Sequence, residues 1–227
     1  MTPHQLHFPL PAKVAMGDQD FFVSDANSHA HDMVRADHGW PDGKLALIGP
    51  QGSGKTHLAR VWASQGGGTI LAAAELGRAA PAPGPGALIC VEDVDRLPRA
   101  EEETLFHLHN NVLGGGGRLL LTGRTAPARW NIALPDLSSR MTATTVVHIT
   151  DPDDDLLRAV LTKLFADRQL TPDPRLIQWL LPRMERSFQA ATRIVSELDS
   201  RALSEARVIN LSLAREILDT PPDDGKE

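Results

Sequence analysis

Short apolar runs alternate with amphipathic segments between residues 44 and 149 of this chain. In the segments between the runs, apolar residues recur at the three- and four-residue spacing of a helix. Short strands that alternate with helices imply right-handed crossovers and a parallel sheet that is covered on both faces. The predicted strands span 44–48, 69–73, 87–91, 118–122 and 145–149. Helices are predicted over 24–34, after the turn 49–56 up to residue 66, and over 101–113.

After residue 150 the strand pattern stops and only helical periodicity continues. Four helices are predicted there: 151–168, 172–184, a third capped by Ser187 and ending near 205, and a fourth capped by Ser212 and ending near 218. We therefore expect an α/β domain followed by a small all-helical domain. The expected division is a tail at 1–17, the α/β domain at 18–150, the helical domain at 151–218 and a polar tail at 219–227.

Composition narrows the class of protein. The chain has 227 residues, and 23 Lys and Arg against 29 Asp and Glu give a net charge of −6. This acidic balance, with 4% aromatic residues and no tyrosine, disfavours a protein that wraps or stacks on nucleic acid. The single cysteine, Cys90, excludes an internal disulfide. Without an apolar run of membrane-spanning length or a signal-peptide pattern, we expect a soluble, cytoplasmic protein that does not engage membranes.

A glycine-rich turn follows the first predicted strand and opens the next helix. It fits the pattern G-x-x-x-x-G-K-[ST], whose glycines let backbone N–H groups point at phosphate oxygens beside a helix N-terminus. The lysine reaches the β- and γ-phosphates, and the threonine hydroxyl ligates Mg²⁺. The turn predicts ATP or ADP binding by Gly49, Pro50, Gln51, Gly52, Ser53, Gly54, Lys55 and Thr56, with His57 in the first helical turn near the phosphates.

An acidic pair ends the third predicted strand, where Val91 is followed by Glu92 and Asp93. The first acid is expected to hold the Mg²⁺ shell, and Asp93 to orient or deprotonate the attacking water. The order is Glu then Asp, whereas vigorous ATPases of this layout commonly have Asp then Glu. Asp93 is one methylene shorter than a glutamate in its reach toward that water.

These segments together resemble the AAA+ ATPase domain of the bacterial replication initiator DnaA. The resemblance rests on GPQGSGKTHL, the acidic strand end, LLLTG in the fourth strand and LPDLSSRM before the helical part. It implies a P-loop α/β domain followed by a helical lid, over residues 18–218. It also implies that the segment 20–27, which includes Val23, lines the adenine pocket.

Two polar positions depart from the DnaA pattern. Relatives place an acidic or amide residue after the fourth strand as a γ-phosphate sensor, and Arg124 or Thr125 stands there instead. Relatives carry a phosphate-binding arginine in the third lid helix, where Gln189 stands here. Arg193 follows one helical turn later and either substitutes for that arginine or is simply solvated. With the Glu-Asp order, these departures predict tight nucleotide binding with weak or no intrinsic hydrolysis.

The two ends of the chain shape the expected function. The N-terminal peptide is similar to motifs that dock on the sliding clamp, the β subunit of DNA polymerase III, as an extended chain. The resemblance to DnaA ends in a lid followed by a polar tail, so we expect no sequence-specific DNA reading. The predicted clamp-binding residues are Gln5, Leu6, Phe8, Pro9 and Leu10.

This combination resembles the DnaA-related regulatory adaptors that inactivate DnaA. The resemblance implies that Arg140, in the segment SSRM, acts in trans as an arginine finger on ATP bound to DnaA. A short AAA+ ATPase such as a helicase loader is an alternative, and so is an adaptor that positions DnaA without accelerating hydrolysis. The sequence leaves open whether ADP or ATP is the resting ligand and whether a homodimer hides Arg140.

Overall fold

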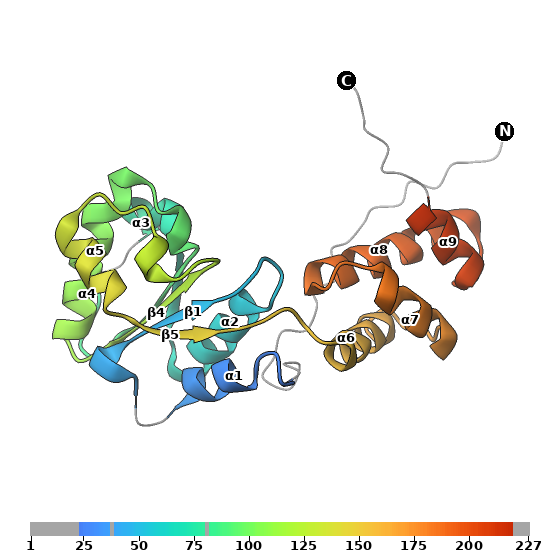
Figure 1. Cartoon of the computed structure of the whole chain (residues 1–227), viewed down its shortest axis with the longest axis horizontal. Coiled ribbons are helices and arrows are strands. Elements are labelled where there is room, and N and C mark those ends of the chain that lie inside the picture. The colour runs from blue at the N-terminus through green and yellow to red at the C-terminus, as the bar shows by residue number, and fades with distance from the viewer. Residues whose placement is uncertain (1–22, 37–38, 80–81, 220–227) are drawn as a thin grey trace, which may run out of the picture.

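A five-stranded parallel sheet forms the centre of the first domain (Figure 1). The computed structural model describes residues 23–36, 39–79 and 82–219. The strand order is β2-β3-β4-β1-β5, so β1 lies between β4 and β5. All five predicted strands are confirmed, and no strand end differs from the prediction by more than one residue. They are β1 (Lys44–Ile48), β2 (Thr69–Ala72), β3 (Leu88–Glu92), β4 (Arg118–Gly123) and β5 (Thr145–His148).

Helices cover both faces of the sheet, and alternate residues of each strand point to opposite layers. Leu45 and Leu47 of β1 pack in the cluster that includes α1 and α2 residues. Ala46 and Ile48 pack in the cluster formed with α4 and α5. Because both faces are buried, the strand is a continuous apolar run rather than an alternating one. The helices are α1 (Ser28–Arg35), α2 (Lys55–Gly66), α3 (Leu76–Ala79), α4 (Glu102–Gly114) and α5 (Pro135–Thr142).

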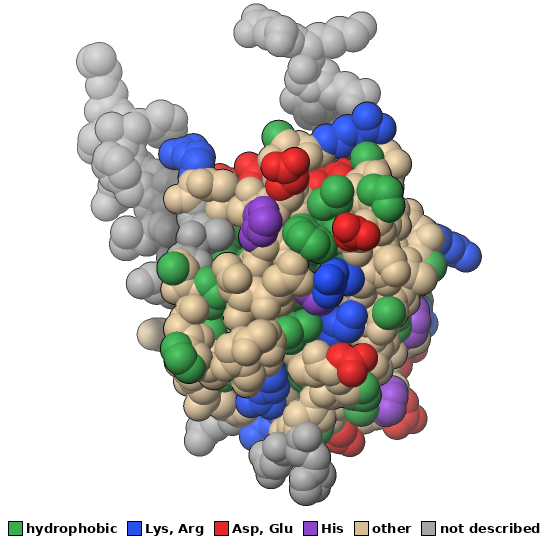
Figure 2. All heavy atoms as spheres, turned by 90° about the vertical axis from the view of Figure 1, so that its left-hand side faces the viewer, with side chains coloured by type: hydrophobic (Ala, Val, Ile, Leu, Met, Phe, Trp, Pro, Cys, Tyr) green, Lys and Arg blue, Asp and Glu red, His purple; other side chains and the backbone are tan. Residues whose placement is uncertain are grey.

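The layer of α3, α4 and α5 forms the end of the molecule that lies farthest from the second domain (Figure 1). Figure 2 shows this end face-on, with Lys and Arg side chains near its middle among mostly uncharged atoms. Short 3₁₀ segments join the elements of the chain. They span Pro41–Gly43, Ala73–Glu75, Val94–Arg96, Arg99–Glu101, Pro127–Arg129 and Leu181–Arg183.

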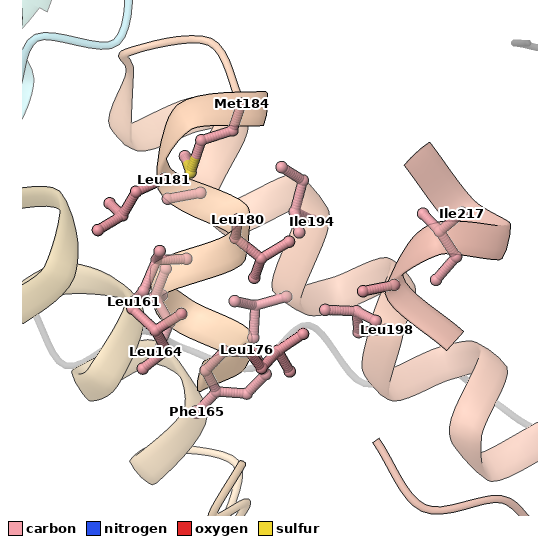
Figure 3. Packing of buried hydrophobic residues seen from close by; sticks show 14 of the residues in the cluster. Leu161, Leu164, Phe165, Leu176, Leu180, Leu181, Met184, Ile194, Leu198 and Ile217 are labelled. Carbon is pink, nitrogen blue, oxygen red and sulfur yellow. The ribbon is translucent and has the colours of Figure 1, made fainter. Parts of the chain in front are cut away.

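Among its described residues the second domain contains helices joined by short loops and no strand, which confirms the predicted fold class. Leu161, Phe165, Leu176 and Leu198 from three of its helices meet in one buried cluster (Figure 3). A cluster drawn from several helices gives this domain a hydrophobic core of its own. Its helices are α6 (Asp154–Ala166), α7 (Pro174–Leu180), α8 (Phe188–Glu205) and α9 (Leu211–Asp219).

Side-chain caps set where the lid helices begin. Ser187 caps α8 as predicted, because its hydroxyl accepts a bond from the Ala190 amide at 3.1 Å. The prediction that Ser212 caps the last helix is wrong, since Asn210 accepts from the Leu213 amide at 3.0 Å and Ser212 lies inside α9. The helix predicted to reach residue 184 stops being α-helical after Leu180, because Pro182 supplies no amide donor.

A short hinge joins β5 to the lid. In this hinge, the Thr150 amide donates to the carbonyl of Ala26 at 3.0 Å, and the Thr150 hydroxyl reaches the same oxygen at 3.3 Å. The segment before α1 is therefore fastened to the point where the two domains meet. Within the part of the chain that the structure describes, no helix has the length and apolar character needed to cross a bilayer.

Cys90 provides a test of the buried sheet. It lies in β3 with its side chain fully buried, and burial raises the pKa of its thiol well above the ordinary value. Above about pH 8.5 the unfolded chain therefore binds fewer protons than the folded one, and the free energy of unfolding falls by up to about 1.4 kcal/mol per pH unit. Cys90→Ala removes this contribution and leaves the other titratable side chains in place.

We expect the stability difference between wild type and Cys90→Ala to shrink as pH rises from 7.5 to 10. Urea unfolding of both proteins across this range measures that difference. Parallel stability curves for the two proteins would show that the thiol titrates alike in the folded and unfolded states.

Candidate nucleotide-binding site

The predicted phosphate loop connects the carboxyl end of β1 to the first turn of α2. Gly52 and Gly54 have positive φ angles of 75° and 95°, a conformation that glycine adopts readily. The Gly49 amide donates to the Gly123 carbonyl at 3.2 Å, which ties the start of the loop to the end of β4. Because α2 begins at Lys55, its free amides and positive helix end face the loop. This geometry suits a phosphate group.

Lys55 is held inside the loop. The residue is only 8% exposed. Its Nζ donates to the carbonyls of Gly49 and Pro50, both at 2.7 Å. Burial lowers the pKa of this ammonium group, the Asp93 carboxylate opposes that shift, and the Arg124 guanidinium adds to it. Nearby, the Ser53 hydroxyl is buried without a hydrogen-bond partner among the described residues. Lys55 and Ser53 can both bind phosphate oxygens.

The acidic pair lies across β4 from the loop. Glu92 is the last residue of β3, and Asp93 follows with φ of 57° while its amide donates to the Thr122 hydroxyl at 3.1 Å. The sheet order places β4 between β1 and β3, so Thr122 and Gly123 bridge the acids and the phosphate loop. Sequence inspection gives neither this order nor the bridge.

The acidic residues at the end of β3 could bind a magnesium ion that also contacts the nucleotide phosphates. Glu92 Oε1 and Asp95 Oδ1 are buried and lack hydrogen-bond partners among the described residues, which is costly for carboxylates without a cation or water. Asp95 was not predicted; its only sequence signal is that it is a third acid close to the strand end. Thr56 is exposed at the start of α2, so its hydroxyl could join Glu92 and water molecules around Mg²⁺.

No group of three or more His, Cys, Asp or Glu side chains that could hold a metal ion occurs in the described part of the chain. A magnesium ion there would therefore take further ligands from phosphate and water, which is its usual coordination in phosphoryl-transfer sites. His57 is half-buried in the first turn of α2, as expected.

The first turn of lid helix α8 packs directly on the phosphate loop. The Phe188 amide donates to the Gly52 carbonyl at 3.0 Å. A β-carbon at Gly54 would lie 2.9 Å from the Phe188 ring, and one at Gly52 would lie 3.1 Å from Cβ of Ser187. The close approach therefore requires glycine at both positions. Phe188 was not predicted as a site residue.

Gln189 lies at this contact, but Arg193 makes no described contact with the loop. Gln51 Nε2 donates to Gln189 Oε1 at 3.3 Å, and Arg124 Nη2 donates to Gln51 Oε1 at 2.7 Å. Arg193 is exposed on α8, and together with Gln189 and Glu197 it lines a shallow groove. Of the two predicted lid residues, the structure brings only Gln189 to the phosphate loop.

Val23 begins the described part of the predicted adenine-pocket segment. Its side chain is 51% exposed, and no described contact joins it to the phosphate loop. The segment itself is ordered by Asn27, a buried residue whose Oδ1 accepts from the Ser24 amide at 2.9 Å. The predicted clamp-binding residues Gln5, Leu6, Phe8, Pro9 and Leu10 lie outside the described residues.

Arg140 lies at the other end of β1 from the phosphate loop. It is exposed on α5, and its guanidinium carbon is 5.2 Å from the centre of the Phe106 ring. Its backbone carbonyl accepts from Lys44 Nζ at 2.8 Å, and Lys44 is the first residue of β1. The loop follows the last residue of that strand, about 13 Å farther along by strand rise. The structure does not bring Arg140 to the chain's own phosphate loop.

A buried carboxylate fixes the segment that leads into α5. Glu102 accepts from the Ala133 amide at 3.0 Å and from the Leu134 amide at 2.7 Å, one bond to each carboxylate oxygen. Pro135 then starts α5, because the fixed φ angle of proline suits the first helical position. Glu102 thus sets the orientation of the helix that carries Arg140. The sequence showed Glu102 only as one of several acids at a helix start.

Solved structures of other proteins share this fold. Domain III of the replication initiation protein DnaA from Thermotoga maritima is 15% identical with a TM-score of 0.77, over 92% of this chain and 98% of that one. AMPPCP-bound DnaA from Aquifex aeolicus is 16% identical with a TM-score of 0.65, over 82% and 66%.

The Thermotoga maritima RuvB Holliday junction branch migration motor is 17% identical with a TM-score of 0.61, over 78% of this chain and 61% of that one. No protein-family model matches the chain. At these identities the similarities show the fold alone, which is that of an AAA+ nucleotide-binding domain with a helical lid.

The glycine contacts lead to a prediction about nucleotide affinity. Gly54→Ala places a methyl group against Phe188 and strains a residue whose φ is 95°, so we expect at least about tenfold weaker ADP binding. Titration with a fluorescent ADP analogue measures this loss.

Gly67→Ala is the matched control at the other end of α2. Gly67 also has a positive φ, of 67°, but a methyl group there meets nothing within 4 Å. We expect Gly67→Ala to cost about 1 kcal/mol of stability and to leave ADP affinity unchanged. Equal affinity losses in the two variants would mean that backbone strain alone, not the lid contact, matters.

Proposed function

We propose that the chain binds ATP or ADP with Mg²⁺ at the phosphate loop. The loop amides and Lys55 bind the phosphates, Ser53 adds a hydroxyl, and Thr56 and Glu92 hold the magnesium shell with water. The buried, partner-lacking oxygens of Ser53 and Glu92 support this assignment. The contact between α8 and the loop supports a position of the nucleotide between the two domains, with the lid beside the phosphates.

The chain's own site is poorly equipped for hydrolysis. Asp93, rather than a longer glutamate, stands where an attacking water would be oriented. Its amide is tied to Thr122, and Arg124 occupies the position after β4 where an acidic or amide side chain is common. We infer that bound nucleotide serves mainly as a structural element that holds the domains in one arrangement.

We further propose that the chain is a DnaA-related adaptor of the Hda type, which lowers the level of ATP-bound DnaA. In this role the N-terminal peptide docks on the sliding clamp, and Arg140 enters the nucleotide site of a neighbouring DnaA. The observation that carries the proposal is the placement of Arg140, exposed on α5 and remote from its own phosphate loop. An arginine so placed lies away from the chain's own phosphate loop, so a finger role would require a nucleotide held by a second molecule.

The chemistry of Arg140 is charge neutralisation. As water attacks the γ-phosphate on DnaA, negative charge spreads over the transferring phosphoryl group, and a guanidinium in contact with it stabilises the transition state. Arginine fingers of this kind accelerate hydrolysis by about 10³ to 10⁵. The guanidinium lies over the Phe106 ring, and the Glu102 bonds anchor the segment that leads into α5, so the helix that carries Arg140 has a fixed position.

Removal of Arg140 tests the adaptor role. In a mixture of DnaA-ATP and DNA-loaded clamp, we expect Arg140→Ala to reduce the stimulated hydrolysis rate at least about 100-fold, and Arg140→Lys to restore only part of it. Release of radiolabelled phosphate from DnaA-bound ATP measures the rate.

The control for this experiment is Arg175→Ala, which removes an exposed arginine from lid helix α7. It should leave the stimulated rate unchanged. Full stimulation by Arg140→Ala would contradict the finger, and it would favour an adaptor that acts on DnaA in another way.

The N-terminal peptide is tested separately. Gln5→Ala with Leu6→Ala removes the side chains proposed to fix and fill the clamp pocket, so we expect at least about tenfold weaker capture on immobilised clamp. The neighbouring change His4→Ala should capture normally. Capture that is insensitive to both sets of changes would instead support a clamp-independent AAA+ ATPase such as a helicase loader.

A further inference from the structure

Two arginines of the lid stack on one tryptophan. Trp179 lies half-buried near the end of α7, and the guanidinium carbon of Arg183 is 4.5 Å from the centre of its ring. Arg215 belongs to α9, and its guanidinium carbon is 5.9 Å from the centre of the same ring. Cation–π attraction therefore holds two positive groups at one place on the lid. We call Trp179, Arg183 and Arg215 the arginine–tryptophan cluster.

Neither arginine of the cluster has a carboxylate within ion-pair distance in the described part of the chain. The acid that follows Arg215 in the sequence, Glu216, binds another arginine, because its two carboxylate oxygens accept from Arg207 at 2.8 and 2.9 Å. Other lid arginines each have an acid of their own. These pairs are Arg158 with Asp155, Arg186 with Asp154 and Arg201 with Glu205.

The cluster also keeps most of its hydrogen-bond donors unused. A guanidinium group has five N–H donors, and Arg183 spends one on the carbonyl of Trp179 at 3.1 Å. Both arginines are exposed, and no described hydrogen bond uses the side chain of Arg215. Stacking on the ring fixes the plane of a guanidinium and leaves its edge open. Such an edge is suited to paired bonds with two oxygens of one anionic group.

The spacing of the two charges favours a polyanion. The two guanidinium carbons are at most about 10 Å apart, which is about the screening length at 0.1 M salt, so both charges act on the same ligand. Duplex DNA carries one negative charge per about 1.7 Å of its axis, so it offers phosphates at this separation whatever its sequence. An acidic protein segment would need two carboxylates at one particular separation. The cluster therefore fits a DNA backbone better than it fits an acidic polypeptide.

We propose that the arginine–tryptophan cluster is a contact surface for the phosphate backbone of duplex DNA. Arg183 and Arg215 bind phosphate oxygens, Trp179 fixes the position of both guanidinium groups, and no base is read. The contact is small, so it orients the lid on DNA without wrapping it. This agrees with the net charge of −6, which describes the whole chain rather than this surface.

The proposed contact is separate from the nucleotide site. Helix α9, which carries Arg215, lies at the end of the lid that is far from the α/β domain (Figure 1). The inference therefore does not rest on nucleotide binding, on the clamp peptide or on Arg140. A chain that docks on a DNA-loaded clamp, as proposed above, would nevertheless have duplex DNA close to its lid.

Fluorescence anisotropy of a labelled duplex of about 30 base pairs tests the contact on the full-length chain. At about 50 mM NaCl, we expect Arg183→Ala with Arg215→Ala to weaken binding at least about tenfold. Between about 50 and 200 mM NaCl, the slope of log affinity against log salt should become shallower by about 1.8, because two phosphate contacts are lost. A duplex of unrelated sequence should give the same values.

The matched control is Arg158→Ala with Arg201→Ala, which removes the same charge from two ion-paired lid arginines. It should weaken binding less than about twofold and leave the salt slope unchanged. Equal losses in the two double variants would overturn the proposal, because net charge alone would then explain them. Arg183→Lys with Arg215→Lys keeps both charges and loses the planar forks, so it should bind between wild type and the double alanine variant.

Trp179→Leu tests the role of the ring. This variant keeps both charges and an apolar side chain, so we expect about two- to fivefold weaker binding with the salt slope unchanged. Full affinity in Trp179→Leu would contradict the positioning role of the ring. A wild-type chain that fails to bind the duplex at about 50 mM NaCl, yet binds polyglutamate through Arg183 and Arg215, would overturn the DNA contact in favour of an acidic polypeptide.

Discussion

The close packing of the α8 amino terminus on the phosphate loop is the contact on which the rest of the site depends. Phe188 lies against Gly54, and its amide bonds to the Gly52 carbonyl, so only glycine fits at these two positions without a shift of the lid. Through this contact the ends of α2 and α8 meet at one place, although they belong to different domains. The hinge bond between Thr150 and Ala26 is a second connection at the junction of the two domains. A nucleotide that binds here touches both domains and can couple their arrangement.

The position of β4 concentrates charge at the carboxyl edge of the sheet. Because β4 lies between β1 and β3, it separates Lys55 from the acids while its own end adds Arg124. Burial dominates at Lys55 and lowers its pKa, even though Asp93, Asp95 and Glu92 all favour the charged form. The carboxylates are therefore not neutralised by this lysine alone. A magnesium ion on their side and phosphates on the side of the two cations would together balance both sets of charges.

The sequence predicted the elements that local patterns encode, and it missed the contacts between residues that are far apart in the chain. Strands buried on both faces are visible as apolar runs, and the loop pattern located Lys55 between a strand and a helix. The strand order, the Phe188 contact and the Gln51–Gln189 bond join residues far apart in the chain, and no local pattern marks them. The misplaced cap of α9 has a different cause. Asn210 and Ser212 are both good capping residues, and only the backbone geometry decides between them.

Arg140 and the phosphate loop lie at opposite ends of β1, and this constrains how the chain can assemble with another nucleotide-binding protein. If Arg140 acts on nucleotide held by another AAA+ protein, the α5 face of one molecule meets the nucleotide edge of the next, and the two surfaces differ. Such a heterologous contact leaves an unused nucleotide edge on one molecule and an unused α5 face on the other. In a pair of copies of this chain that met in this way, Arg140 of one copy would face the nucleotide edge of the other, and the α5 face of the second copy would stay uncovered. Under the proposed finger role, the copy whose α5 face is covered in such a pair could not present Arg140 to DnaA, so self-association and action on DnaA would compete for the same surface.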